Sequence, residues 1–216
     1  MSDIQEYWNK WILEWEATSY EGGHPRGLIE TLASRVREVN RRMTDAVSMI
    51  SPVIHGKTVL DLGCGSGVLC ALLLQKGAKE AWGVDFSQEA IQRATTRTRE
   101  LNLAERSHFV CANVLEIEYP KADITVSLGL LDYLTPEQVR ILFRKVRSPY
   151  YIFSFLQRRW SFWTLLHVLY TIHRKVPVVQ RFTSAEITGL LEAAGHDGYR
   201  IDPQTSFITR LPPNSG

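Results

Sequence analysis

Short apolar runs alternate with segments of helical spacing through the middle of the chain. Strands are predicted at 58–62, 80–85, 107–112, 123–128 and 150–155. Apolar spacing and capping residues predict helices between them, at 66–76, from Ser87 to about Leu101, and from Thr135 to before Pro149. Strict alternation of strand and helix indicates a parallel sheet covered by helices on both faces. Two short strands near 198–202 and 205–209 favour one antiparallel strand at or near its end.

The segments on either side of this pattern are helical or aromatic. Residues 1–20 are rich in Trp and Tyr, and residues 28–50 have helical apolar spacing. An aromatic and basic insert, 156–181, follows the fifth predicted strand, and Thr183 then opens a helix that Gly195 closes. We therefore predict one domain overall, with an N-terminal helical segment at 1–50, which the resemblance described below implies is a lid, and a core at 51–216.

Composition places the chain among globular proteins. It has 216 residues, of which 44% are hydrophobic and 22% charged, enough for one domain with a real core. Its three cysteines have no paired or metal-type spacing, which favours a reducing cytosol and no metal site. The acidic, aromatic N-terminus is unlike a secretory signal, and no apolar run is long enough to span a membrane. We expect a cytoplasmic protein.

A glycine-rich turn follows the first predicted strand. Gly63 and Gly65 allow the backbone to bend beside a ligand, and Gly67 allows the next helix to pack closely. Asp85 stands 22 residues after Gly63, at the end of the next strand, where a carboxylate can accept both hydroxyls of a ribose. These features together indicate a nucleoside-bearing ligand, and Val68 at the third-glycine position of the dinucleotide fingerprint disfavours NAD.

The runs VLDLGCGSG and GVDFS resemble motif I and its acidic follower in the class I S-adenosylmethionine-dependent methyltransferases. The resemblance covers roughly residues 57–210. It implies a Rossmann-like fold with a mostly parallel seven-stranded sheet, helices on both faces, an N-terminal helical lid and a helical insert after the fifth strand. It also implies S-adenosyl-L-methionine as the cofactor and S-adenosyl-L-homocysteine as its product.

The same resemblance assigns roles to individual residues. The loop of Gly63, Cys64 and Gly65 carries the methionine part of the cofactor, and Cys64 needs no catalytic role there. Asp85 holds the ribose and Phe86 packs on the adenine. Asp61 supports the loop and can face the methionine amino group, or is a purely structural cap.

Two later segments complete the implied site. CANV stands where the family often has an acid that meets the adenine amine, so Asn113 and Val114 are predicted to contact the adenine, without a charge. SLGLLDY, which includes Leu128, is similar to the variable motif beside the transferable methyl group. It lacks the Pro-Pro-aromatic signature of enzymes that methylate amino groups of DNA bases or glutamine, so we disfavour those activities.

The part of the chain that includes the insert after the fifth predicted strand is basic. From Gln138 to Ala185 the chain has nine Lys or Arg residues and no Asp or Glu. The basic, aromatic stretch 158–175 favours an anionic or amphipathic acceptor. The alternatives are a solvated helix face that balances the acidic N-terminus, and a peripheral contact with anionic lipid through 158–175.

Methyl transfer is an in-line displacement that requires alignment, and a base only where the acceptor loses a proton. His24, in a glycine-flanked loop, and Asp132 are the candidate bases. Arg37, Arg41 and Arg42 precede motif I on one helix and either reach the cofactor carboxylate or form a solvated basic face.

These observations predict a methyltransferase that acts on a small molecule, with O-methylation of an anionic or amphipathic acceptor favoured. The arrangement is similar to the ubiquinone and Mg-protoporphyrin branches of the family. The alternatives are an RNA or protein methyltransferase and a non-catalytic S-adenosylmethionine-binding subunit. We expect no nucleic-acid partner, because no appended recognition domain is visible, and the sequence leaves the acceptor, the methylated atom and the oligomeric state open.

Overall fold

The chain folds around one mixed sheet. The computed structural model describes residues 6–10, 39–158 and 179–212, and within them seven strands are ordered β3-β2-β1-β4-β5-β7-β6. These strands are β1 (Thr58–Leu62), β2 (Glu80–Asp85), β3 (Ser107–Cys111), β4 (Ile124–Ser127), β5 (Tyr150–Ser154), β6 (Arg200–Asp202) and β7 (Phe207–Arg210). The first five are parallel to one another, and β7 runs antiparallel to both β5 and β6. The predicted fold class is confirmed.

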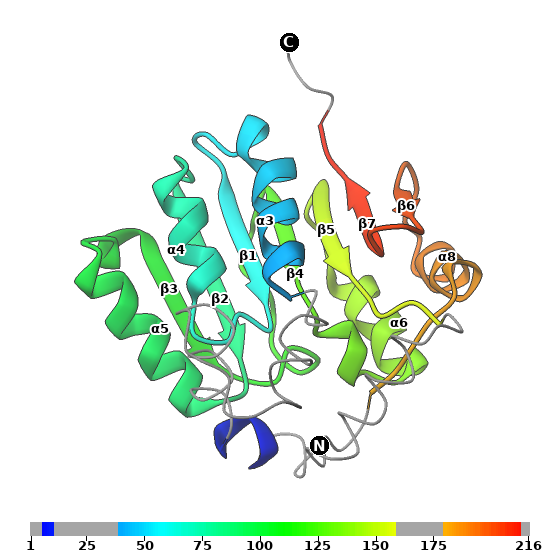
Figure 1. Ribbon diagram of the computed structural model, residues 1–216, viewed down its shortest axis with the longest axis horizontal. Coiled ribbons are helices and arrows are strands. Elements are labelled where there is room, and N and C mark those ends of the chain that lie inside the picture. Colours follow the sequence, from blue (N-terminus) through cyan, green and yellow to red (C-terminus); the bar gives the residue numbers. More distant parts are fainter. Residues whose placement is uncertain (1–5, 11–38, 159–178, 213–216) are drawn as a thin grey trace, which may run out of the picture.

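Helices cover both faces of the sheet (Figure 1). One layer holds α3 (Val39–Ile50), α4 (Val68–Gln75) and α5 (Gln88–Glu100), and the other holds α6 (Pro136–Lys145) and α8 (Ser184–Ala193). Three short 3-10 turns join these elements: η1 (Ser51–Val53), η2 (Ala104–Arg106) and η3 (Leu131–Tyr133). Because the central strands β1, β4 and β5 are buried on two sides, their sequences show largely continuous apolar runs rather than strict alternation.

Successive side chains of β1 point to opposite faces of the sheet, so each residue's position in the strand decides which helix layer it contacts. Val59 lies in the core cluster with α3 and α4, whereas Leu60 and Leu62 lie in the cluster with α6 and α8. Asp61 has the parity of Val59, and its side chain meets Cys70 of α4. A carboxylate is thereby carried into the apolar layer directly beneath the glycine turn.

Local capping sets the helix starts. The hydroxyl of Ser87 accepts the Ala90 N–H at 3.2 Å, and complete capping boxes begin α6 at Thr135 and α8 at Thr183. The helix after the glycine turn begins at Val68 and not at 66 as predicted, because Gly67 is its N-cap residue with φ +72°. The last strand begins at Phe207 rather than 205, because Asp202 accepts the Gln204 and Thr205 N–H groups in a turn.

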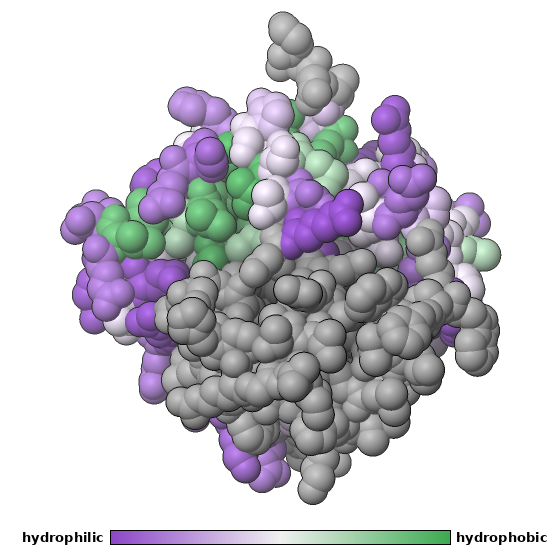
Figure 2. Space-filling model, in the orientation of Figure 1, coloured by the Kyte–Doolittle hydropathy of each residue, from purple (hydrophilic) through white to green (hydrophobic). Residues whose placement is uncertain are grey.

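Part of the predicted lid belongs to the core. Ala46 and Ile50 of α3 are fully buried, with partly buried Met43 and Val47 packed against the same cluster. On this face of the molecule, apolar surface gathers beside α4 within a hydrophilic rim (Figure 2). Residues 6–10 are also helical. The division at residue 50 stays a prediction, and none of the described helices is long and apolar enough to cross a bilayer.

Candidate active site

The glycine turn joins β1 to α4 at the carboxyl end of the sheet. Gly63, Gly65 and Gly67 have φ values of +75°, +51° and +72°, in the left-handed region that glycine adopts at no steric cost. The Gly63 and Cys64 N–H groups both donate to the carbonyl of Val84, at 2.8 and 3.1 Å. The turn is therefore folded back onto the end of β2.

At two of these glycines a side chain would have little room: it would collide with a neighbour at Gly67 and make a tight contact at Gly63. A Cβ on Gly67 would lie 2.8 Å from the Cβ of Ala94 in α5, and a Cβ on Gly63 would lie 3.2 Å from that of Leu130. The bare backbone at Gly63 thus brings the turn close to the loop after β4. The backbone of the turn therefore lies between the end of β2 and the loop after β4.

Asp85 ties the turn to the next helix. One carboxylate oxygen accepts the Gly65 N–H at 3.0 Å and the other accepts the Ser87 N–H at 2.9 Å. Burial raises the pKa of Asp85, and hydrogen bonding from the backbone amides of Ser87, Gly65 and Phe86 opposes the rise. Each oxygen has a further lone pair, so the carboxylate can still accept the two hydroxyls of a ribose.

Asp61 lies under the turn, only 3% exposed. Its carboxylate accepts a hydrogen bond from the Cys70 thiol, with 3.6 Å between sulfur and oxygen. Burial raises the pKa of Asp61 to about 7; the thiol hydrogen bond opposes that rise and the charge of Asp85 adds to it. A cationic ammonium placed beside this carboxylate would favour its ionised form.

The Cys64 side chain is turned into the core. A Cβ on Gly83 of β2 would lie 2.8 Å from the Cys64 sulfur, so the thiol occupies the space that glycine leaves free. Burial raises the pKa of this thiol well above its ordinary value. Cys64 can therefore serve a ligand through its backbone, and its side chain has a packing role.

The predicted adenine side lies at the ends of β2 and β3. Phe86 is half-buried, and its carbonyl accepts a hydrogen bond from the Cys111 thiol at 3.5 Å. The Asn113 side-chain oxygen accepts the Leu115 N–H at 3.1 Å, and its amide donates to Glu116 at 2.6 Å. Val114 is 6% exposed and packs in the core cluster with α6. Contact of Phe86, Asn113 and Val114 with a ligand stays a prediction.

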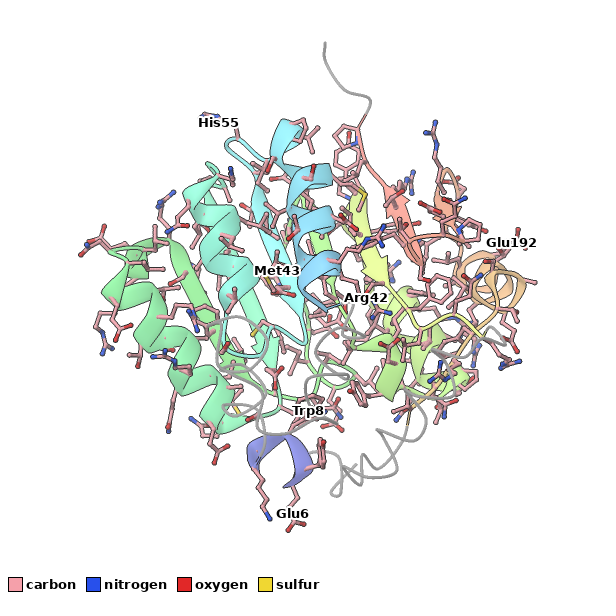
Figure 3. The ribbon with its side chains drawn as sticks, in the orientation of Figure 1. Glu6, Trp8, Arg42, Met43, His55 and Glu192 are labelled. Carbon is pink, nitrogen blue, oxygen red and sulfur yellow. The ribbon has the colours of Figure 1, made fainter. Side chains whose placement is uncertain are left out.

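The loop after β4 closes the carboxyl end. Leu128 is partly buried against the α3–α4 cluster, and the Gly129 N–H donates to the Ser154 hydroxyl at 2.9 Å. The rings of Trp8 and Tyr133 meet edge to face with centroids 5.4 Å apart. Trp8 lies at the carboxyl-end side of the sheet in Figure 3. The N-terminal helical residues therefore reach the side of the sheet that holds the glycine turn.

Asp132, one of the two candidate bases, is buried in this loop with 5% exposure. Its oxygens accept hydrogen bonds from Arg42 Nη1 at 3.1 Å and from the Leu156 N–H at 2.6 Å. Burial raises the pKa of Asp132, and the charge and hydrogen bond of Arg42 oppose the rise. His24, the other candidate, lies outside the described residues, and both catalytic assignments stay predictions.

The residues at the carboxyl end fit a ligand that carries a nucleoside and an ammonium. Asp85 offers acceptors for hydroxyls, Asp61 offers a buried carboxylate, and the turn between them has no side chain at Gly63 or Gly65 to obstruct approach. Residues 59–148 match the family model described as a methyltransferase domain. These residues form a methyltransferase domain. The resemblance to class I S-adenosylmethionine-dependent methyltransferases is thus confirmed over this segment.

Known proteins agree with this assignment. A ribosomal protein arginine N-methyltransferase of Schizosaccharomyces pombe is 39% identical over 77 residues, which cover 35% of this chain and 14% of that protein. The 27-O-demethylrifamycin SV methyltransferase of Amycolatopsis mediterranei is 27% identical over 98 residues, 45% of this chain and 36% of that protein. The matches thus span only a minor part of these curated relatives.

The fold likeness extends over nearly the whole chain. Magnesium protoporphyrin IX methyltransferase from Synechocystis, solved with bound S-adenosylhomocysteine, has a TM-score of 0.70 at 18% identity, covering 96% of this chain and 95% of that chain. At this identity the likeness establishes the fold alone. It extends the agreement beyond the methyltransferase domain to the segments on both sides.

Arg42 is the site residue that sequence reasoning places wrongly in space. The sequence predicts either a solvated helix face or a contact with the cofactor carboxylate, yet Arg42 is 7% exposed and paired with Asp132. Arg41 does lie on a solvated face, where it pairs with Asp45 at 3.7 Å. Arg37 lies outside the described residues. No local pattern marks Arg42, because its partner is 90 residues away along the chain.

Proposed function

We propose that the protein transfers the methyl group of S-adenosylmethionine to an oxygen atom of a small anionic or amphipathic acceptor. The observation that carries the proposal is the position of Asp85, which ties the glycine turn to the end of β2 and leaves lone pairs for ribose hydroxyls. The bound cofactor would supply an electrophilic methyl group on its sulfonium. The described residues bind and orient the reactants.

Different residues would contact different parts of the cofactor. The turn at Gly63 and Gly65 would border the methionine part, and Asp85 would accept the ribose hydroxyls. Asp61, in its ionised form, would accept the methionine ammonium from below the turn. Phe86 and Asn113 would border the adenine.

The acceptor assignment is supported by the fold neighbour and by charge. The Synechocystis enzyme is named for magnesium protoporphyrin IX, which is a carboxylate-bearing small molecule. Methyl transfer to a carboxylate releases no proton from the acceptor, so the enzyme needs alignment and exclusion of water but no base. Of the basic stretch 158–175 only Arg158 is described, and it pairs with Glu186 at 3.0 Å. The membrane contact predicted for this stretch stays a prediction.

A protein acceptor is the second candidate. The 39% identity with an arginine N-methyltransferase favours it, although that match covers 77 residues. We also propose a cytoplasmic location, which is supported by the three free cysteines because a reducing compartment keeps thiols unpaired.

Calorimetric titration of the full chain with S-adenosylmethionine and S-adenosylhomocysteine tests the cofactor. We expect saturable binding of both and none of NAD. Release of S-adenosylhomocysteine is then measured with magnesium protoporphyrin IX, a neutral phenol, and ribosomal protein as acceptors. Turnover with the carboxylate acceptor supports the proposal, turnover only with ribosomal protein supports the second candidate, and binding without any turnover supports a non-catalytic subunit. Failure to bind either sulfur nucleoside overturns the assignment.

A further inference from the structure

The Arg42–Asp132 ion pair is buried on both sides. The side chains of Arg42 and Asp132 are each 8% exposed, with 3.1 Å between Nη1 and the carboxylate. Arg42 Nη2 also donates to the carbonyl of Phe155 at 3.3 Å, and Figure 3 shows Arg42 between α3 and the end of β5. The pair therefore links α3 to the loop after β4 and to the chain that leaves β5.

Asp132 contacts both ends of the insert. Its carboxylate accepts the Leu156 N–H at 2.6 Å, at the first residue of the insert, and its main-chain carbonyl accepts the Gln180 N–H at 2.6 Å, near the last residue of the insert. The two ends also bond to each other: Phe182 N–H donates to Leu156, and Arg158 N–H donates to Phe182, both at 2.9 Å. Residues 155–158 and 179–182, which we call the insert roots, thus meet at Asp132.

The burial of both side chains distinguishes this pair from an ion pair on the protein surface. Removing two charges from water costs several kcal/mol for each ion, which a simple pair does not reliably recover. Here both carboxylate oxygens are used, while Arg42 Nε is buried without a hydrogen-bond partner. Such a pair adds little net stability, whereas removing one partner leaves the other charge buried and uncompensated.

We propose that Asp132 and Arg42 are positioning residues that hold the insert roots and the loop after β4 in one arrangement against α3. The functional part of this inference rests on the proposed function, together with the predicted position of the loop after β4 beside the transferable methyl group. Asp132 does not serve as the general base in this arrangement. A base must present a lone pair to the acceptor proton, whereas both oxygens of Asp132 are directed at Arg42 and Leu156.

Hydrogen exchange on the full chain without ligand tests the positioning. Asp132→Asn and Arg42→Met are compared with Asp123→Asn. Asp123 is a matched control because its carboxylate also accepts a backbone N–H, from Thr58 at 2.9 Å, and pairs with Lys57, but at the amino end of the sheet. In Asp132→Asn the one remaining side-chain oxygen cannot accept from both Arg42 and Leu156 as the two carboxylate oxygens do, so exchange at Leu156 can change directly. The decisive amides are therefore Gln180 and Phe182, whose main-chain acceptors remain.

We expect exchange at Gln180 and Phe182 to become at least tenfold faster in Asp132→Asn and Arg42→Met, and to stay unchanged in Asp123→Asn. Arg42→Lys, which keeps the charge, should restore most of the protection and also serves if a more severe variant does not fold. Acceleration confined to Leu156, or equal acceleration in the control, overturns the proposal.

Ligand measurements separate this proposal from the proposed function. The dissociation constant of S-adenosylhomocysteine should change less than threefold in Arg42→Met. For an acceptor that the natural chain methylates, we expect the KM of the acceptor to rise by a larger factor than kcat falls. The effect should be the same in Arg42→Met and in Asp132→Asn. A loss of kcat in Asp132→Asn that Arg42→Met does not share identifies a base and overturns the positioning role. The exchange result stands whether or not methyl transfer is found.

Discussion

The carboxylate of Asp85 lies 3.0 Å from the amide nitrogen of Gly65, twenty residues earlier in the chain. Its other oxygen lies 2.9 Å from the amide of Ser87. One side chain thereby fixes the glycine turn and the start of α5 at the same place. Cofactor binding and local stability consequently depend on the same carboxylate.

Replacing Asp85 by Ala should weaken both properties. Two partly buried N–H groups lose their acceptor, and a group that is left unsatisfied costs up to about 1–3 kcal/mol of unfolding free energy. The ribose would lose a charged acceptor, so we expect affinity for S-adenosylhomocysteine to fall roughly 10- to 100-fold, as for hydrogen bonds to a charged group. Urea unfolding and calorimetric titration measure the two effects.

Asp123→Ala is the control for this substitution. It also removes the acceptor of a backbone N–H, that of Thr58, but at the far end of β1. We expect lower stability with unchanged affinity. If Asp85→Ala likewise left the affinity unchanged, Asp85 would be a structural residue and the ribose assignment would fail.

Local patterns were sufficient to predict the framework of this site. The apolar runs gave the five parallel strands, and the capping residues Thr135 and Thr183 marked the starts of their helices correctly. Asp85 could be placed beside the glycine turn because neighbouring parallel strands end at the same edge of the sheet. All of these features depend on residues close in sequence or on a repeating order of elements.

The contacts that complete the site are not local. The partner of Asp132 is on α3, and the acceptor of the Gln180 N–H is Asp132 itself, 48 residues earlier. A residue's spacing within its own helix does not reveal which distant carboxylate it meets. For the same reason Asn113 could be placed at the end of β3, but its bonds to Leu115 and Glu116 could not be predicted.

The buried carboxylate of Asp61 should make stability depend on pH. Its pKa is about 7 in the folded chain and 3.8 as the ordinary value, so the folded state retains a proton that the unfolded state releases between these values. The stabilising contribution is full below about pH 4 and is lost as the pH rises to about 7. Asn at position 61 cannot ionise. The free energy of unfolding of Asp61→Asn should therefore rise by about 3 kcal/mol relative to that of the natural chain as the pH goes from 5 to 8. The same difference in unfolding free energy between the two proteins at pH 5 and at pH 8 would contradict this.

Cofactor affinity should show the opposite trend in the natural chain. Above pH 7 the ionised Asp61 can accept the ammonium of S-adenosylhomocysteine, so affinity should rise from pH 6 to pH 8. In Asp61→Asn the affinity should be weaker at pH 8 and nearly flat with pH. A flat profile in both proteins would leave Asp61 as a structural cap of the turn.

The close approach of α4 and α5 should make Gly67 intolerant of a side chain. Gly67→Ala combines positive φ with a contact of 2.8 Å to Ala94, whereas Gly56→Ala has the same φ of +72° and nothing within 4 Å. We expect about 1 kcal/mol of destabilisation at Gly56 from backbone strain, and roughly 1–3 kcal/mol more at Gly67 from overpacking. Equal losses in urea unfolding would show that the helix simply moves away.

Asn113 stands where the family often has an acid, and its neighbour Glu116 explains why an acid is unfavourable here. The Asn113 amide donates to the Glu116 carboxylate at 2.6 Å, so Asn113→Asp would place two carboxylates in contact. We expect Asn113→Asp alone to lower stability by about 1 kcal/mol without tightening S-adenosylhomocysteine binding. In Asn113→Asp with Glu116→Gln the Gln amide donates to the carboxylate at position 113, which restores stability and leaves further lone pairs of that carboxylate for the adenine amine. The double variant should therefore bind more tightly than either single variant, and equal affinities in all of them would place the adenine away from residue 113.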